Sequence, residues 1–388
     1  MKLTKTFNAF FHSEKSGGII LLLVTIGSLL LANSAFQTQY ISFWNTELGH
    51  HTITEWINDG LMTIFFLLIG LELEREMYQG ELADIKNAIL PIFGALGGMI
   101  VPAGIFLALN YGTITQNGAG IPMATDIAFA IGVLSLLGKR IPTSLKVFLT
   151  ALAVIDDLGA ILVIAIFYTQ TIAFDNLFYA FAVMGFLFIL NRRKVHHLAP
   201  YLIGGAFMWY FMLNSGVHAT ITGVLLAFVI PFGDGGKQTA SYRLQHFLHQ
   251  PVAFIILPLF AIANTCLPIE SDWHEGLSHE NSIGIILGLV VGKPLGIWFF
   301  SFLAVTLGIC TLPKDLKWKN ILGAGMLGGI GFTMSIFITL LAFKNDGEEI
   351  ITYSKIAILI ASFLSGTIGF LWLKFTFKIP IKQLKSKK

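Results

Sequence analysis

Two adjacent carboxylates, Asp156 and Asp157, lie in the middle of a long apolar run that extends from Val147 to Phe167. With about ten residues on either side and a helical rise of ~1.5 Å per residue, the pair falls near the midplane of a bilayer. One carboxylate is costly there, and two neighbours are costlier, because like charges in a poor dielectric resist joint ionisation. A bound cation or bound protons can offset this charge, so the pair indicates ion transport rather than a stabilising role.

The composition is typical of an integral membrane protein. Of the 388 residues, 55% are hydrophobic and only 12% are charged, against about 25% charged in an ordinary soluble domain. The mean hydropathy is +0.76. The net charge of +3 is small and gives no indication of nucleic-acid binding. Because no small-residue cleavage site follows the first apolar run, we interpret that run as a retained span.

The apolar runs predict an all-α protein with twelve membrane-spanning helices. Alternating the sides of these spans places 22 of the 25 Lys and Arg residues on one side, with only Lys344 and Lys355 on the other and Lys293 inside a span. The positive-inside rule then predicts that both termini are cytoplasmic, and an odd number of spans would destroy this asymmetry. The predicted spans are roughly 17–35, 57–77, 88–109, 117–137, 147–169, 176–191, 198–213, 216–231, 251–266, 283–307, 320–343 and 350–373.

Four ionisable residues fall at a similar depth inside the predicted spans. Asp126 lies about nine residues into the fourth span, and Asp156, Asp157 and Lys293 lie about ten residues into theirs, which puts all four near the midplane. A buried structural ion pair explains any one of them equally well. Four at one depth instead favour a solvated functional site.

Two of the spans are predicted to be interrupted near their centres. Pro122 follows Gly118 and Gly120 in the fourth span, and Gly328, Gly329 and Gly331 lie within the eleventh. Proline removes a backbone donor and glycine weakens a helix, although small residues also serve close helix packing. The region of about 88–169 then resembles that of about 283–373 with opposite orientation, which predicts an inverted-topology repeat, a pattern that points to a transport site.

Six segments carry a resemblance to a known family. The fourth span contains ATDIAFA, the fifth IDDLGA, the tenth GKPLG and the eleventh GFTMSIF. FFLLIGLE occurs in the second span and SGVHAT at the start of the eighth. These segments resemble the signature segments of the NhaA sodium/proton antiporters, in the same order through nearly the whole chain. This family is a standard example of inverted repeats.

The resemblance implies one transmembrane antiporter domain over residues 1–388, in the inner membrane of a bacterium, whose discontinuous fourth and eleventh helices cross. It implies electrogenic export of Na⁺ or Li⁺ in exchange for H⁺, with two H⁺ per Na⁺, for pH and sodium homeostasis. It also implies a homodimer in membrane lipid. No cofactor, enzymatic activity or nucleic-acid partner is expected.

The residues at the crossing then have expected roles. Asp157 is the main Na⁺ carboxylate, and Asp156 alternates between ligating the cation and pairing with Lys293. Thr125 adds a further oxygen ligand, since hard oxygen ligands suit Na⁺ or Li⁺. Asp126 offsets the positive ends of the half-helices and Lys293 offsets the negative ends.

A second cluster is a candidate for pH regulation. Glu72 lies near the cytoplasmic end of the second span, and His246 and His249 precede the ninth on the same side. Histidine is the side chain that titrates nearest neutrality, and interfacial anchoring explains these residues equally well. Gln245 departs from the family pattern, which has an acidic residue beside these histidines, so we expect a shifted or shallower pH profile.

Two further polar residues lie near the predicted outer ends of spans. His218 opens the eighth span and is either a hydrogen-bonding residue at a helix end or a second pH sensor. Asp59, near the start of the second span, is expected to be structural.

The outer segment of about 36–56 is the longest predicted loop. Its Tyr40–Trp44 stretch is typical of a strand, a plain loop is an equal alternative, and the family implies a hairpin that joins two protomers. The acidic loop Glu270–Glu275 is interpreted as a solvated surface. Cys266 and Cys310 are predicted near opposite membrane faces, which argues against a disulfide between them.

Two other functions are compatible with intramembrane acids. A sodium-coupled symporter for an organic solute would need more polar residues at midplane depth than the sequence provides. An intramembrane aspartic protease would share a proton between two facing carboxylates, but the Gly-x-Gly-Asp pattern of such enzymes is absent, and Lys293 would disturb the sharing.

Overall fold

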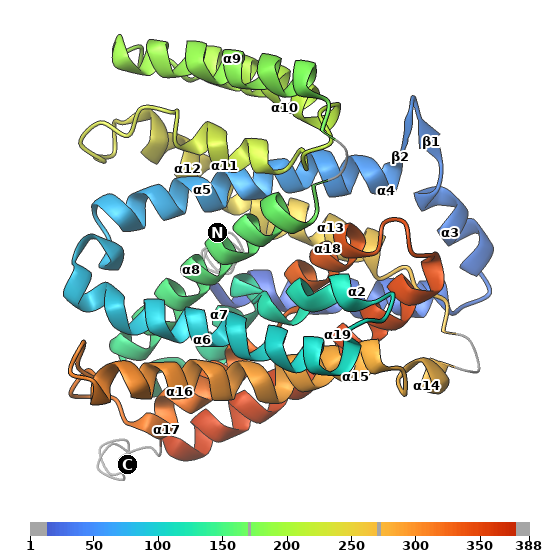
Figure 1. The fold of residues 1–388 in the computed structure, drawn as a ribbon, viewed down its shortest axis with the longest axis vertical. Coiled ribbons are helices and arrows are strands. Elements are labelled where there is room, and N and C mark those ends of the chain that lie inside the picture. Colours follow the sequence, from blue (N-terminus) through green and yellow to red (C-terminus); the bar gives the residue numbers. More distant parts are fainter. Residues whose placement is uncertain (1–13, 170–171, 270–272, 378–388) are drawn as a thin grey trace, which may run out of the picture.

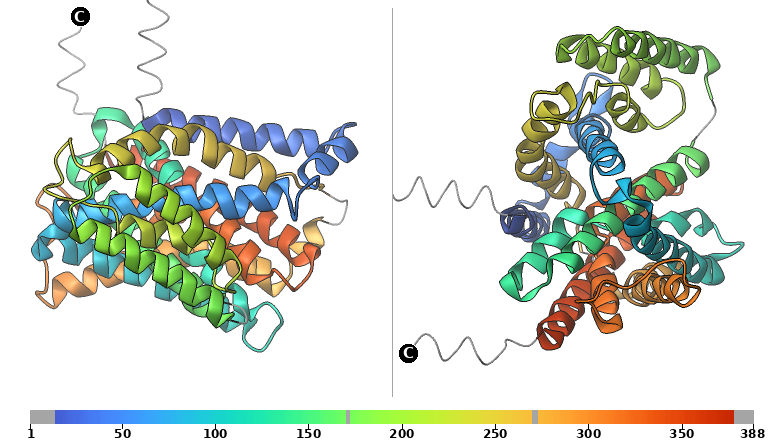
Figure 2. Two further views of the ribbon diagram at one scale, coloured as in Figure 1. Left: turned by 90° about the horizontal axis from the view of Figure 1, so that it is seen from above. Right: turned by 90° about the vertical axis from the view of Figure 1, so that its left-hand side faces the viewer.

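The structure, a computed structural model, describes residues 14–169, 172–269 and 273–377. The predicted cytoplasmic ends, 1–13 and 378–388, and residues 270–272 of the acidic loop lie outside the described residues. Most helices run roughly along one direction, with α9 and α10 on one side of the molecule and α16 and α17 on the opposite side (Figures 1 and 2).

The first half of the chain is helical apart from one small sheet. Its elements are α2 (Glu14–Ala32), α3 (Gln37–Trp44), β1 (Glu47–Leu48), β2 (His51–Thr52), α4 (Ile53–Glu55), η1 (Trp56–Leu61), α5 (Met62–Tyr78), η2 (Glu81–Ala83), α6 (Ile85–Asn110), η3 (Gln116–Met123), α7 (Ile127–Leu136), η4 (Gly138–Arg140) and α8 (Thr143–Phe167).

The second half has only helical elements among its described residues. They are α9 (Phe174–Arg192), α10 (Leu198–Leu213), α11 (Ile221–Ala227), α12 (Ala240–Pro251), η5 (Val252–Ile256), α13 (Leu257–Asn264), α14 (Trp273–Gly276), α15 (Glu280–Leu287), η6 (Gly288–Gly292), α16 (Lys293–Thr306), α17 (Trp318–Gly328), α18 (Phe332–Ala342) and α19 (Glu348–Thr376).

Eight helices in the described residues are long and apolar enough to cross a membrane, or up to ten if each of two bent pairs forms one span. Outside this set, α10 is an apolar helix of 16 residues and α11 has only 7. The predicted span 216–231 is therefore helical only over α11. The backbone explains this, because Gly216 has a φ of +84° before α11 and Pro231 follows it without an N–H to donate.

The outer segment differs from the sequence prediction at Tyr40–Trp44. These residues belong to the helix α3, so the predicted strand is wrong at this position. The tertiary contacts favour the helix, since Tyr40 and Trp44 are one helical turn apart with ring centroids 6.1 Å apart and the Tyr40 hydroxyl donates to Ser28 Oγ at 2.9 Å. The two-residue strands β1 and β2 pair antiparallel just after it, with Leu48 opposite His51.

Both predicted interruptions are present, and the two breaks meet. In the first, η3 and α7 are separated by Ala124–Asp126, where the backbone is extended. In the second, α17 and α18 are separated by residues 329–331 and bend by 51°. The Asp126 N–H donates to the Ile330 carbonyl at 2.7 Å. A donor in the first break and an acceptor in the second, both outside the helices, are therefore satisfied by each other.

Wide helical turns precede two prolines on the membrane helices. The π-helical turn η6 ends at Gly292, two residues before Pro294, and η5 ends at Ile256, two residues before Pro258. Because a proline ring collides with the carbonyl four residues earlier and offers no N–H, a wider turn accommodates it. Lys293 begins α16 directly after η6, so the wide turn determines the direction in which the Lys293 side chain enters the protein.

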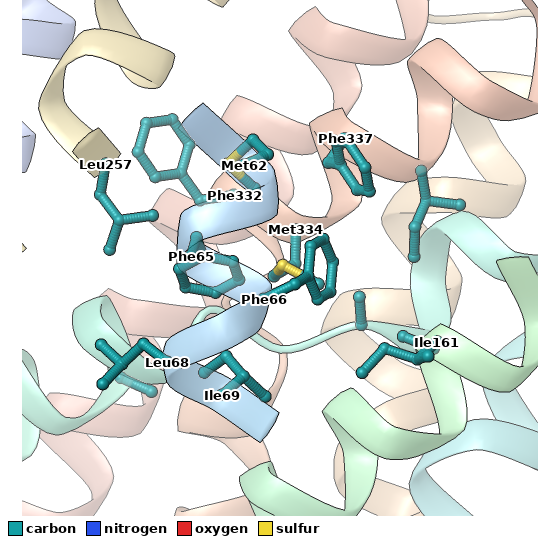
Figure 3. Close-up of a cluster of buried hydrophobic side chains, with 14 of the residues drawn as sticks. Met62, Phe65, Phe66, Leu68, Ile69, Ile161, Leu257, Phe332, Met334 and Phe337 are labelled. Carbon is teal, nitrogen blue, oxygen red and sulfur yellow. The ribbon is translucent and has the colours of Figure 1, made fainter. Parts of the chain in front are cut away.

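Glycines allow α6 and α16 to approach closely. A Cβ at Gly97 would lie 2.1 Å from the Gly296 carbonyl oxygen, and a Cβ at Gly296 equally close to that of Gly97. This contact brings Lys293, at the start of α16, near the interrupted helices. On the other side of the crossing, α5 packs its Phe66 ring 5.4 Å from that of Phe337 on α18 (Figure 3).

Candidate ion-binding site at the helix crossing

Asp156 and Asp157 lie on α8 and are each 1% exposed. Asp156 Oδ2 accepts from Lys293 Nζ at 2.6 Å and lies 2.7 Å from Thr125 Oγ1. Thr125 Oγ1 is also 2.8 Å from the Gly328 carbonyl, and because a hydroxyl has one proton it can donate to only one of these acceptors at a time. Thr125 and Lys293 thus both contact Asp156, and the structure contains the Asp156–Lys293 pair that the sequence analysis expects.

One carboxylate oxygen of each residue in the pair has no hydrogen-bond partner among the described residues. These atoms, Asp156 Oδ1 and Asp157 Oδ1, are buried. Buried polar atoms are nearly always partnered, and a buried carboxylate is strongly disfavoured without a counter-charge. These two oxygens are therefore able to bind a cation or to accept a proton without breaking another contact.

Asp126 caps two half-helices at once. As the N-cap of α7, its Oδ1 accepts from the Phe129 N–H at 2.9 Å, while its Oδ2 accepts from the backbone N–H of Thr333 at 3.2 Å and from the Thr333 hydroxyl. Thr333 lies in the first turn of α18. Because both helix N-termini carry partial positive charge, one carboxylate at this position stabilises both.

Lys293 contacts a helix end of the opposite polarity. Besides Asp156, its Nζ donates to the carbonyl of Met123, the last residue of η3. A cation is favourable near the free carbonyls at a helix C-terminus. Lys293 itself is fully buried, so both of its partners offset the cost of removing its ammonium from water.

Several residues at the crossing were not predicted from sequence as functional. Thr333 binds Asp126, and the Ser335 hydroxyl donates to the Ile121 carbonyl at 2.7 Å. Ser362 on α19 accepts from the Phe332 N–H at 3.1 Å, which satisfies a free donor at the start of α18. Thr333 and Ser335 lie within the GFTMSIF segment, which was the available signal. For Ser362 the sequence gives none, because its partner is 30 residues away on another helix.

The second predicted cluster is partly assembled. His249 Nδ1 lies 3.7 Å from Glu72 Oε1. The His246 ring instead stacks on the Tyr242 ring, with 5.9 Å between the ring centroids. Gln245 accepts from Arg75 Nε at 2.6 Å, and the Arg75 guanidinium lies over the Tyr242 ring. Gln245 thus links α12 to α5 as a neutral partner of Arg75.

His218 and Asp59, which the sequence treats as unrelated, are neighbours. His218 Nε2 lies 3.6 Å from Asp59 Oδ1, and its Nδ1 lies 2.7 Å from Thr220 Oγ1. The His218 ring also packs edge-on against Phe337 of α18. These contacts join η1 and the turn before α11 to α18, where Phe337 lies one helical turn after the crossing residue Thr333.

Comparison with known proteins gives a consistent result. The model of the family described as Na⁺/H⁺ antiporter 1 matches residues 8–373. The chain is 72% identical to the Na(+)/H(+) antiporter NhaA 1 of Flavobacterium johnsoniae, over 97% of this chain and 98% of that protein. It is 64% identical to the Na(+)/H(+) antiporter NhaA of Flavobacterium psychrophilum over the full length of both, and 61% identical to that of Dechloromonas aromatica over 96% of this chain and 97% of that protein. With its apolar helices and this match over nearly its whole length, the chain is a multi-pass membrane protein that belongs to the Na⁺/H⁺ antiporter 1 family, the family of the NhaA antiporters.

Proposed function

We propose that this protein is an electrogenic secondary antiporter that exports Na⁺ or Li⁺ from the cytoplasm in exchange for H⁺. The observation that carries this proposal is the pair of unpartnered buried oxygens, Asp156 Oδ1 and Asp157 Oδ1, beside the crossing of two interrupted helices. The names of the relatives support the same exchange reaction. Transport is a movement of ions without a chemical transformation, so no enzymatic activity is part of the proposal.

Na⁺ and H⁺ compete for the same carboxylates in this proposal. Without Na⁺, desolvation and the repulsion between adjacent charges favour proton uptake by Asp156 and Asp157. Na⁺ favours the ionised forms and displaces the protons. Asp157 is the main Na⁺ ligand, because its oxygens are not committed to Lys293. Asp156 joins when Lys293 releases it, and Thr125 adds a hydroxyl oxygen.

Two carboxylates permit a stoichiometry of two H⁺ per Na⁺. One net charge then crosses per cycle, worth ~2.3 kcal/mol per 100 mV. An inside-negative potential therefore drives Na⁺ outward, which suits a role in pH and sodium homeostasis.

The proposed architecture is one antiporter domain over residues 1–388, with twelve spans and inverted repeats of about 88–169 and 283–373. The interrupted pairs η3–α7 and α17–α18 support it, since each pair occupies the corresponding position in one repeat. In this arrangement the short helices α10 and α11 correspond to the predicted spans 198–213 and 216–231. The ribbon β1–β2 lies in the proposed outer segment of about 36–56.

The proposed location is the inner membrane of a bacterium, with both termini cytoplasmic. The distribution of Lys and Arg supports this orientation. The proposed partners are membrane lipid and a second copy of the chain. The two copies would be joined through the outer segment, and this homodimer is supported by the family resemblance alone. We further propose that Glu72, His246, His249 and His218 contribute to pH regulation.

Sodium-triggered proton release from inverted, acid-loaded membrane vesicles tests the exchange. Wild type is compared with Asp157→Asn. The control variant, Asp175→Asn, makes the same substitution at a carboxylate in the first turn of α9, outside the candidate site. We expect rapid release from wild type and the control, and none from Asp157→Asn at comparable abundance in the membrane. Retained Na⁺-dependent proton flux in Asp157→Asn would overturn its role as the main ligand. The absence of any Na⁺ response in wild type, at every pH tested, would overturn the exchange itself.

A further inference from the structure

An apolar groove of about 310 Å³ opens between α2, α7, α18 and α19, away from the paired acids. Its longest wall is a stripe on α19 from Leu359 through Phe363 and Phe370 to Leu371. The twelve residue steps from Leu359 to Leu371 rise by roughly 18 Å, which is close to the ~15 Å depth of one hydrocarbon leaflet. The groove therefore extends through about one leaflet of the membrane.

The lining of the groove is mostly apolar, and its polar side chains do not call for a polar ligand. Two of its polar side chains are already bonded within the protein, because the Thr25 hydroxyl donates to Leu21 O at 2.7 Å and Ser362 accepts from the Phe332 N–H. Leu22, Leu136 and Phe363 line it and are 43%, 52% and 71% exposed. An apolar occupant is therefore favoured, and at this depth the surroundings consist of lipid acyl chains.

The groove suits a thin, flexible chain better than a helix. A lipid tail has this shape, whereas a transmembrane helix has a diameter of ~10 Å. We therefore assign the groove to a lipid tail.

A basic residue lies at one end of the stripe. Lys374 follows Phe370 by one helical turn, and its Nζ lies 5.8 Å from the centroid of the Phe370 ring. Arg140 is exposed four residues beyond Leu136, at the same end of α7. These cations belong to the membrane face that carries most of the Lys and Arg residues, where the lipids are anionic.

From these observations we infer that the groove binds one anionic phospholipid, with an acyl chain between α2, α7 and α19 and its phosphate beside Lys374. The bottom of the groove is formed partly by Phe129 and Phe332, whose ring centroids are 5.8 Å apart. These residues lie in the first turns of α7 and α18, and their N–H groups donate to Asp126 and Ser362 respectively. The bound chain therefore packs directly against the starts of both half-helices at the crossing.

Native mass spectrometry of the full-length protein in detergent tests this inference. The probes are phosphatidylglycerol and phosphatidylcholine with the same acyl chains. Thr367 is exposed and lines the groove, so Thr367→Phe fills it, while Ile368→Phe places the same phenyl ring at an exposed neighbour that does not line it. Lys374→Gln removes the charge, and Lys314→Gln removes an exposed charge elsewhere.

We expect wild type to retain one phosphatidylglycerol in preference to phosphatidylcholine. Thr367→Phe should lose both lipids while it keeps the thermal stability of Ile368→Phe. Lys374→Gln should retain phosphatidylglycerol about fivefold less than Lys314→Gln, the factor for one basic side chain near an anionic surface. Equal retention by Thr367→Phe and Ile368→Phe overturns the groove as the site. Equal retention by the two lysine variants overturns the headgroup contact.

Discussion

Lys293 and Asp156 form an ion pair in which both side chains are 0% exposed and Nζ lies 2.6 Å from Oδ2. Such a pair is weak support for stability, because the cost of removing two charges from water offsets their attraction. The pair uses only one oxygen of Asp156 and leaves Oδ1 unpartnered. This arrangement is suited to a partner that can be exchanged, which is what competition between Lys293 and a cation requires.

The buried pair predicts strongly non-additive stability. Lys293→Gln leaves ionised Asp156 without a counter-charge and should cost about 3–5 kcal/mol. Asp156→Asn in the same chain removes that unpaired charge, so the double variant should recover much of the loss. Denaturant unfolding of the purified protein at neutral pH measures the cycle. Costs of the two single changes that simply add in the double variant would show that the residues are not coupled.

The cap on α18 predicts a specific role for the Thr333 hydroxyl. Thr333→Val removes one donor from the buried Asp126 carboxylate and should cost about 1–3 kcal/mol. Thr339→Val is the matched control, since Thr339 is also buried but donates to the Ser335 carbonyl of its own helix at 2.8 Å. Thermal unfolding compares them. Equal losses in both variants would contradict a special contribution from the cap.

The close approach of α6 and α16 predicts a steric effect at one glycine. Gly97→Ala places a Cβ 2.1 Å from the Gly296 carbonyl oxygen, and such overpacking should destabilise the protein by about 1–3 kcal/mol. Gly104→Ala, on the same helix, meets no atom within 4 Å in the described part of the chain, so it should be neutral or slightly stabilising. Thermal unfolding distinguishes them, and a tolerated Gly97→Ala would mean that the two helices can separate without cost.

Competition at the paired acids predicts a pH dependence of the apparent affinity for Na⁺. As the pH falls, more protons occupy the site and a higher Na⁺ concentration is needed to displace them. The half-saturating Na⁺ concentration should therefore rise, by up to about tenfold per pH unit for each displaced proton. Exchange rates in vesicles over a range of Na⁺ concentrations and pH values give this dependence. A half-saturating concentration that does not change with pH would contradict a shared site.

The sequence predicted some features because they depend on residue type over long stretches. Apolar runs identified most of the long helices, and Pro122 and Gly329 marked helices that are interrupted in the structure. The strand at Tyr40–Trp44 was wrong because the preference of its residues for strands was outweighed by packing of Tyr40 against Trp44 and Ser28. Local preference is weak where tertiary contacts compete with it.

By itself, the sequence determined that the chain enters a membrane and where its helices break, and it placed Asp156, Asp157, Asp126 and Lys293 near the centres of predicted spans. These properties follow from the cost of exposing polar groups to hydrocarbon, which each segment meets on its own. The pairing of Lys293 with Asp156 was already expected from the sequence, but only the tertiary structure decided that Asp126 binds Thr333 and that His218 lies beside Asp59. Each pair joins residues from separate segments of the chain, and their contacts depend on close packing and helix direction, which no pattern within a single segment specifies.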